Sequence, residues 1–189
     1  MSTKPLKVLF VSAEVAPFSA VGGLAQVAYF LPKALKKVGV DIRVFTPKYG
    51  SINSAILQTQ NVIQGLKVPT GEPAQSSHPR ELVCNIKILK SPKQGDPTIY
   101  FLENMEYYEK RANVYGYADD TARWVLLSKG VLEFIKVSKW KPDIIIAADW
   151  QCGFIPNLIR VDYKNDPILS KIKTIFCIHN LQFQGLFDH

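Results

Sequence analysis

Residues that could do chemistry follow three separate apolar runs of this sequence. They are the glycine pair Gly22 and Gly23, then Asp149, and finally His179 with Asn180. If the apolar runs are parallel strands, their carboxyl ends lie along one edge of a sheet, so these groups converge there. A carboxylate can accept hydrogen bonds from hydroxyls, and an imidazole can donate to a sugar oxygen or to a developing charge. The pattern predicts a site for a sugar or a sugar nucleotide.

The glycine pair opens an amphipathic stretch after a loop over residues 14–21. Glycine has no Cβ, so the backbone at Gly22 and Gly23 can approach a ligand closely or adopt a positive φ. The amides that follow begin a helix, and a helix N-terminus attracts anions, phosphate above all. The alternative is a plain strand–helix connection in which the glycines only permit close packing. The residues leave both interpretations open.

Each of the other candidates also has a structural interpretation. Asp149 could equally cap the helix that follows it, and His179 could be a packing or capping histidine. Trp150 is of a type found more often in a core than as a sugar platform. Cys152 lies close to Asp149 in sequence, but a cysteine–histidine pair requires a contact that sequence cannot supply. A sugar site is therefore favoured over a cysteine nucleophile.

Strands alternating with helices must position these groups. Helices are predicted over residues 23–38, 121–137 and 153–160, with Pro32 bending or locally breaking the first and the aspartates at 119–120 capping the second. Strands are predicted over residues 7–11, 40–46, 98–102, 144–147 and 173–178. Short alternating runs at 65–68 and 82–89 predict a small antiparallel excursion within residues 47–97, whose middle is the least ordered part. The fold class is α/β: a Rossmann-like, doubly wound, mostly parallel sheet.

Composition narrows the function classes. The 189 residues predict one domain, and 47% hydrophobic with 21% charged residues is typical of globular proteins. The net charge of +7 comes from scattered lysines and arginines, which favours a solvated basic surface over a nucleic-acid footprint. Three irregularly spaced cysteines argue against disulfides and zinc and favour the cytoplasm. Neither a signal peptide nor an apolar run long enough to span a membrane is expected.

The motifs resemble a known family. The opening stretch, residues 11–35, reads VSAEVAPFSAVGGLAQVAYFLPKAL and is similar to the start of bacterial glycogen synthases and plant starch synthases, glycosyltransferase family 5. The similarity continues through VFTPKYG at 44–50, the Tyr115–Gly116 pair, and the D-D-x-x-R segment at 119–123. It ends with ADWQCGFIP at 148–156, similar to a His- or Asn-Asp-Trp-His segment, and IHNLQFQGLF at 178–187. It covers nearly the whole chain.

The resemblance implies a GT-B enzyme, in which two Rossmann-like domains face a cleft. Residues 1–189 would be the N-terminal, acceptor-side domain, and the C-terminal domain that holds most of the nucleotide sugar would be absent from this chain. The implied reaction is retaining transfer of glucose from ADP- or UDP-glucose to an α-1,4-glucan, without a metal or another cofactor. The isolated domain is expected to be inactive.

The resemblance also implies residue roles. It places Gly22, Gly23 and Leu24 beside the donor phosphates, and His179 and Asp149 at the reacting glucosyl group. The further residues implied in substrate binding are Gln26, Tyr115, Asn180 and Gln184.

Several positions depart from the family pattern. Ala20 replaces a motif lysine that would stabilise leaving-group charge, and Gln26 replaces an aspartate. The others are Ala148 for His or Asn, Phe183 for Tyr, and Asp120 for Asn. Ala20 and Gln26 support an alternative function, a non-catalytic glucan-binding or regulatory relative with a degenerate donor loop.

Overall fold

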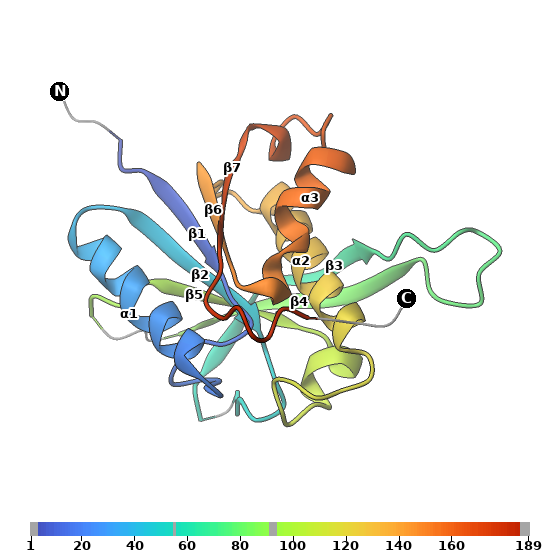
Figure 1. The fold of residues 1–189 in the computed structure, drawn as a ribbon, viewed down its shortest axis with the longest axis horizontal. Helices are drawn as coiled ribbons and strands as arrows, with labels where there is room; N and C mark the ends of the chain where they lie inside the picture. Colours follow the sequence, from blue (N-terminus) through green and yellow to red (C-terminus); the bar gives the residue numbers. More distant parts are fainter. Residues whose placement is uncertain (1–3, 55, 91–93, 186–189) are drawn as a thin grey trace.

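The computed structural model describes residues 4–54, 56–90 and 94–185, and the strands within them form one seven-stranded sheet in the order β3-β4-β5-β2-β1-β6-β7 (Figure 1). β5, β2, β1, β6 and β7 are parallel, whereas β4 pairs antiparallel with both β5 and β3. The strands are β1 Lys7–Val11, β2 Asp41–Pro47, β3 Thr59–Pro69, β4 Glu81–Leu89, β5 Thr98–Glu103, β6 Ile144–Ala148 and β7 Lys173–Cys177. The predicted mostly parallel α/β sheet with a small antiparallel part is confirmed.

Three α-helices in the described residues connect the parallel strands. They are α1 Gly23–Lys37, α2 Asp120–Val137 and α3 Phe154–Val161. The chain moves one way along the sheet from β1 to β2, and the other way from β5 to β6 and from β6 to β7. Because such crossovers are right-handed, α1 covers one face while α2 and α3 share the other. In Figure 1, α1 lies at the left, apart from α2 and α3.

Reversal of the strand order creates a switch point between β1 and β6. Open α/β sheets bind ligands in the crevice outside the carboxyl ends of the strands at such a point. β1 is paired on both sides, with β2 and β6, and its residues Leu9, Phe10 and Val11 are fully buried. Burying such side chains contributes about 1.5–3 kcal/mol each, so this strand anchors the loops at its carboxyl end. The glycine pair follows β1, and Asp149 follows β6.

Two local predictions differ from the structure. α1 continues through the buried Pro32, so the predicted local break is absent, while the predicted bend stays a prediction. The two aspartates at the start of α2 do not cap it: Asp119 binds Arg111 at 2.7 Å, and Asp120 accepts from the Gly116 amide at 2.9 Å and from Arg123. Arginine partners and the preceding loop compete for these carboxylates and leave the first turn of the helix without a side-chain cap.

Irregular turns link the main elements. A π-helical turn, Met105–Glu109, follows β5, and two 3-10 turns, Trp150–Cys152 and Leu169–Lys171, flank α3. Sequence periodicity did not predict these short turns. None of the described helices combines the length and the apolar character needed to cross a membrane.

Strand β7 forms an edge of the sheet that is apolar on both faces. Ile175 is 46% exposed, Phe176 44%, and the following Ile178 58%. Parallel strands are usually covered on both faces, and an exposed apolar edge promotes association with another chain. We therefore expect the 189-residue chain to self-associate as its concentration rises.

Substituting Ile175→Lys should shift this equilibrium toward the monomer, because a charge on an edge strand opposes pairing. Sedimentation velocity over a concentration series measures the effect. Val137→Lys is the matched control, since Val137 is 58% exposed at the end of α2, away from β7. Monomeric behaviour of the unaltered chain at every concentration would contradict the expectation.

Candidate functional site

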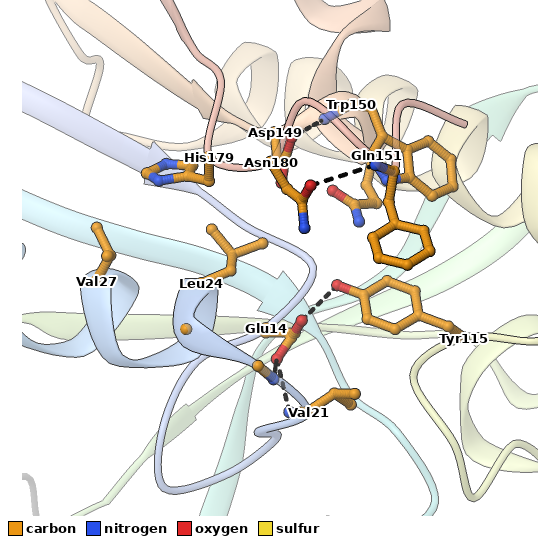
Figure 2. Close-up of a pocket in the computed structure, with 13 residues that line it drawn as sticks. Glu14, Val21, Leu24, Val27, Tyr115, Asp149, Trp150, Gln151, His179 and Asn180 are labelled. Carbon is orange, nitrogen blue, oxygen red and sulfur yellow. Dashed lines mark hydrogen bonds between the residues drawn. The ribbon is translucent and has the colours of Figure 1, made fainter. Parts of the chain in front are cut away.

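A cavity of about 670 Å³ lies at the switch point of the sheet, and its size is within the usual range for small-molecule sites. Figure 2 shows two walls facing each other: residues from the loops after β6 and β7, and residues from the β1 loop, α1 and Tyr115. The lining residues are Glu14, Val21, Gly22, Gly23, Leu24, Val27, Tyr115, Asp149, Trp150, Gln151, His179, Asn180 and Phe183.

Most of the predicted site residues meet in this cavity. Gly22, Gly23, Leu24, Tyr115, Asp149, His179 and Asn180 all line it. Gln26 and Gln184 do not. Leu24 and Val27 are three residues apart on one face of α1, so Gln26 between them points elsewhere and is exposed. Gln184 is also exposed, and its side-chain amide donates to the Leu181 carbonyl. Their predicted roles in substrate binding stay predictions.

The glycine turn is open toward the cavity. Gly22 has an extended backbone with φ of −139°, and a Cβ added at Gly22 or Gly23 would meet no atom within 4 Å. Neither close packing nor a left-handed backbone explains the glycines, so the packing-only interpretation is wrong. The turn instead leaves backbone uncovered at the cavity wall, which is what close approach of a ligand requires.

Glu14 organises this turn, although the sequence did not single it out. Its carboxylate is buried, and Oε2 accepts from the amides of Val21 at 2.6 Å and Gly22 at 2.9 Å. Oε1 accepts from the Tyr115 hydroxyl at 2.6 Å (Figure 2). Burial and this hydrogen bond raise the pKa of Tyr115 well above its ordinary value. The internal carboxylate therefore takes the two amides just before α1, and the helix-start amides that were predicted to attract an anion are not among its partners.

Asp149 caps the turn that follows it and also lies at the cavity wall, where its predicted contact with a sugar stays a prediction. Its backbone has φ of +64°, a left-handed value that costs a non-glycine residue about 1–3 kcal/mol and is commonest at functional sites. Its amide donates to the Cys177 carbonyl at 2.8 Å. Its Oδ1 accepts from the Trp150 amide at 3.0 Å, so it does cap the following 3-10 turn, while the residue lines the cavity. The β6–β7 connection holds the carboxylate at the wall by these contacts.

His179 is exposed and lines the cavity opposite Leu24 and Val27 (Figure 2). It makes no hydrogen bond to any other described residue, so the packing or capping interpretation is wrong. Asn180 shapes the same loop: its Oδ1 accepts from the amides of Gln182 at 2.8 Å and Phe183 at 3.3 Å. The side-chain nitrogen of Asn180 is consequently free to face the cavity, as Figure 2 shows.

Trp150 supports the loop that carries His179. A Cβ on Gly185 would lie only 2.2 Å from the Trp150 indole, and Gly185 has φ of +68°. Glycine is therefore required where this loop crosses the ring. The indole also packs edge-on against Trp124, with 6.1 Å between the ring centroids. Trp150 is thus both a packing residue and part of the cavity wall.

Gln151 is a second wall residue that the sequence did not single out. It is 3% exposed, and its Oε1 is buried without a hydrogen-bond partner among the described residues. An unpaired buried polar group costs about 1–3 kcal/mol, and because Gln151 lines the cavity, a bound ligand or water could supply the missing donor. The available signal was its position in the A-D-W-Q segment, where the similar family segment ends in histidine.

The cysteine nucleophile is excluded. Cys152 is fully buried and does not line the cavity, and its thiol donates to the Val11 carbonyl at 3.4 Å. Burial raises the pKa of this thiol, which keeps it protonated and unreactive. Across the described part of the chain, no group of three or more His, Cys, Asp or Glu side chains is arranged to hold a metal ion.

Comparison with known proteins decides the family. The sequence model described as starch synthase catalytic domain matches residues 7–189. The chain belongs to this family. It is 42% identical to the glycogen synthase of Anoxybacillus flavithermus and 43% identical to that of Caldicellulosiruptor saccharolyticus, each over 182 residues and 96% of this chain. The chain spans only 35% and 36% of the lengths of those two relatives.

A solved structure agrees with the fold. The catalytic domain of starch synthase IV from Arabidopsis thaliana, bound to ADP and acarbose, superposes with a TM-score of 0.82 at 27% identity. The match covers 96% of this chain and 35% of that one. The resemblance to glycosyltransferase family 5 and the GT-B type of Rossmann-like fold are thereby confirmed.

Proposed function

We propose that this chain is the N-terminal, acceptor-side domain of a retaining glucosyltransferase. The enzyme would transfer glucose from ADP- or UDP-glucose to the end of an α-1,4-glucan, as a glycogen or starch synthase. The observation that carries the proposal is the convergence of Tyr115, Asp149 and His179 around one cavity in a chain of this family. The glycogen synthase relatives support it, and no finding favours a non-catalytic function. We also propose a cytoplasmic location, which the three irregularly spaced cysteines favour.

The cavity has the chemistry that a sugar needs. Leu24, Val27 and Phe183 offer apolar surface to a sugar ring, while the Asp149 carboxylate can accept hydrogen bonds from its hydroxyls. The imidazole of His179 can donate to a sugar oxygen or stabilise charge that develops in the transition state. In this proposal Asp149 borders both the glucosyl group and the acceptor end and accepts hydrogen bonds from their hydroxyls, and His179 is the catalytic residue supplied by this domain.

The donor phosphates would be held at the start of α1. Glu14 takes the amides of Val21 and Gly22 just before the helix, whereas Gly23 and Leu24, the two cavity-lining residues of its first turn, have amides that can face an anion. Ala20 lies outside the main cavity, at a neighbouring pocket of about 370 Å³. The positive charge missing at Ala20 would have to come from the second domain. The ADP bound in the Arabidopsis structure supports a nucleoside-diphosphate sugar as the donor.

Titration calorimetry with maltoheptaose tests the acceptor half of the proposal on this chain. We expect saturable binding that weakens when Asp149→Asn removes the carboxylate, since a lost charged hydrogen bond costs about 1.5–3 kcal/mol. Cellohexaose, a β-1,4-linked glucan, is the control ligand and should bind more weakly. Absence of maltoheptaose binding, or equal binding of both glucans, would contradict the proposal.

A further inference from the structure

We propose that Glu14 is a positioning residue that joins the glycine turn to Tyr115 and so sets the shape of one wall of the cavity. It would act through its two partners and would not contact the reacting atoms. The expected effect of Glu14 on glucan affinity rests on the proposed function, whereas its expected effect on the order of the cavity wall does not.

Three donors converge on one buried carboxylate, two from the same loop and one from a distant part of the chain. The Val21 and Gly22 amides lie seven and eight residues away along the sequence, and Tyr115 lies 101 residues away. Tyr115 lies in the segment between β5 and α2, whereas Glu14 lies in the loop between β1 and α1. Glu14 therefore connects two segments that the sheet alone does not hold at a fixed separation.

Only an ionised carboxylate can satisfy all three donors in their present arrangement. It offers two acceptor oxygens and no proton, and charge-assisted bonds of this kind are roughly twice as strong as neutral ones. A glutamine at this position would have one acceptor oxygen, and its NH₂ group would face the Tyr115 hydroxyl. That hydroxyl would have to accept instead of donate, and its proton would lose its partner.

The backbone around Glu14 is fixed without the help of its side chain. The Tyr49 hydroxyl donates to the Ala13 carbonyl at 2.8 Å, and the Val15 amide donates to the Ser19 carbonyl at 3.0 Å. The Ser12 hydroxyl donates to the Glu14 carbonyl at 2.7 Å. Substituting the Glu14 side chain should consequently release its partners while the fold remains.

Backbone order provides the first test, and it needs no ligand. Amide hydrogen exchange, followed by NMR, should be at least about tenfold faster at Val21 and Gly22 in Glu14→Ala, because these amides lose their acceptor. Glu14→Gln should also move both amide proton resonances. Glu81→Gln is the matched control, since Glu81 forms an exposed ion pair with Lys67 on the β3–β4 hairpin. Unchanged exchange in both Glu14 variants would overturn the proposal.

Ligand binding provides the second test. Maltoheptaose affinity should fall about tenfold in Glu14→Gln and less in Tyr115→Phe, which keeps the ring and the two amide bonds. Thermal melting checks that each variant is folded. If Glu14→Ala does not fold, maltoheptaose affinity can still be measured in Tyr115→Phe. If the unaltered chain binds no maltoheptaose, the proposed function fails, and the exchange data still decide the role of Glu14. Full affinity in folded Glu14→Gln, with unchanged amides, would overturn that role.

Discussion

Replacing Arg123 with alanine is expected to lower the free energy of unfolding by about 3–5 kcal/mol, because removing one partner of a buried ion pair leaves the other charge uncompensated. The Arg123 side chain is fully buried on α2, and its guanidinium pairs with Asp120. Its Nε donates to the Tyr107 carbonyl at 2.9 Å, and its Nη1 donates to the Val114 carbonyl at 2.9 Å. The substitution would leave two carbonyls and a carboxylate without their arginine partner.

Aromatic rings surround the same guanidinium. Its central carbon lies 4.8 Å from the Tyr117 ring and 4.9 Å from the Trp124 ring, with Tyr49 and Tyr108 at 5.7 and 5.9 Å. These contacts hold the segment that carries Tyr115 against α2. Lysine cannot replace them, because it lacks the planar fork that reaches two carbonyls and a carboxylate together. Arg123→Lys should therefore recover only part of the loss.

Urea unfolding followed by far-UV circular dichroism measures the change. Arg111→Ala is the matched control: Arg111 also pairs with an aspartate, Asp119, and lies 4.8 Å from the Tyr117 ring, but it is partly exposed. Its loss should cost no more than about 1 kcal/mol. If both variants lost the same stability, Arg123 would not have the central role assigned to it.

The sequence predicted the fold well because the parallel strands are nearly continuous apolar runs. It also predicted that Gly22, Asp149 and His179 would meet, since this depends only on strand ends sharing one edge of a sheet. It could also have shown that Gln26 does not share a helix face with Leu24, because the two residues differ in helical phase by two positions, or roughly 200°. Local spacing was sufficient for these features.

Glu14 and the aspartates before α2 could not be predicted in the same way. The Glu14 contact with Tyr115 joins residues 101 positions apart, and no periodicity encodes it. Asp119 and Asp120 have the residue type and position of helix caps, yet Arg111 and Arg123 take their carboxylates. Propensity describes what a residue can do locally, and tertiary partners decide which of those options is used.

Removing the imidazole of His179 is expected to reduce turnover about 10²–10³-fold, the cost typical of losing one donor to transition-state charge. This test requires both domains, for example residues 1–189 joined to the C-terminal part of the A. flavithermus glycogen synthase. The free energy of unfolding of the 189-residue chain should not change, because His179 is exposed and bonds to no other described residue. Stability and catalysis therefore separate at this position.

Steady-state kinetics with ADP-glucose and a maltooligosaccharide measure the effect, which should appear in kcat more than in KM if the bond to His179 strengthens in the transition state. His179→Gln should recover part of the rate, since a carboxamide can still donate. His78→Ala is the control, because His78 lies exposed in the loop between β3 and β4. Wild-type turnover in folded His179→Ala would remove His179 from the catalytic role, and the proposed mechanism of this domain would then have to depend on Asp149 alone.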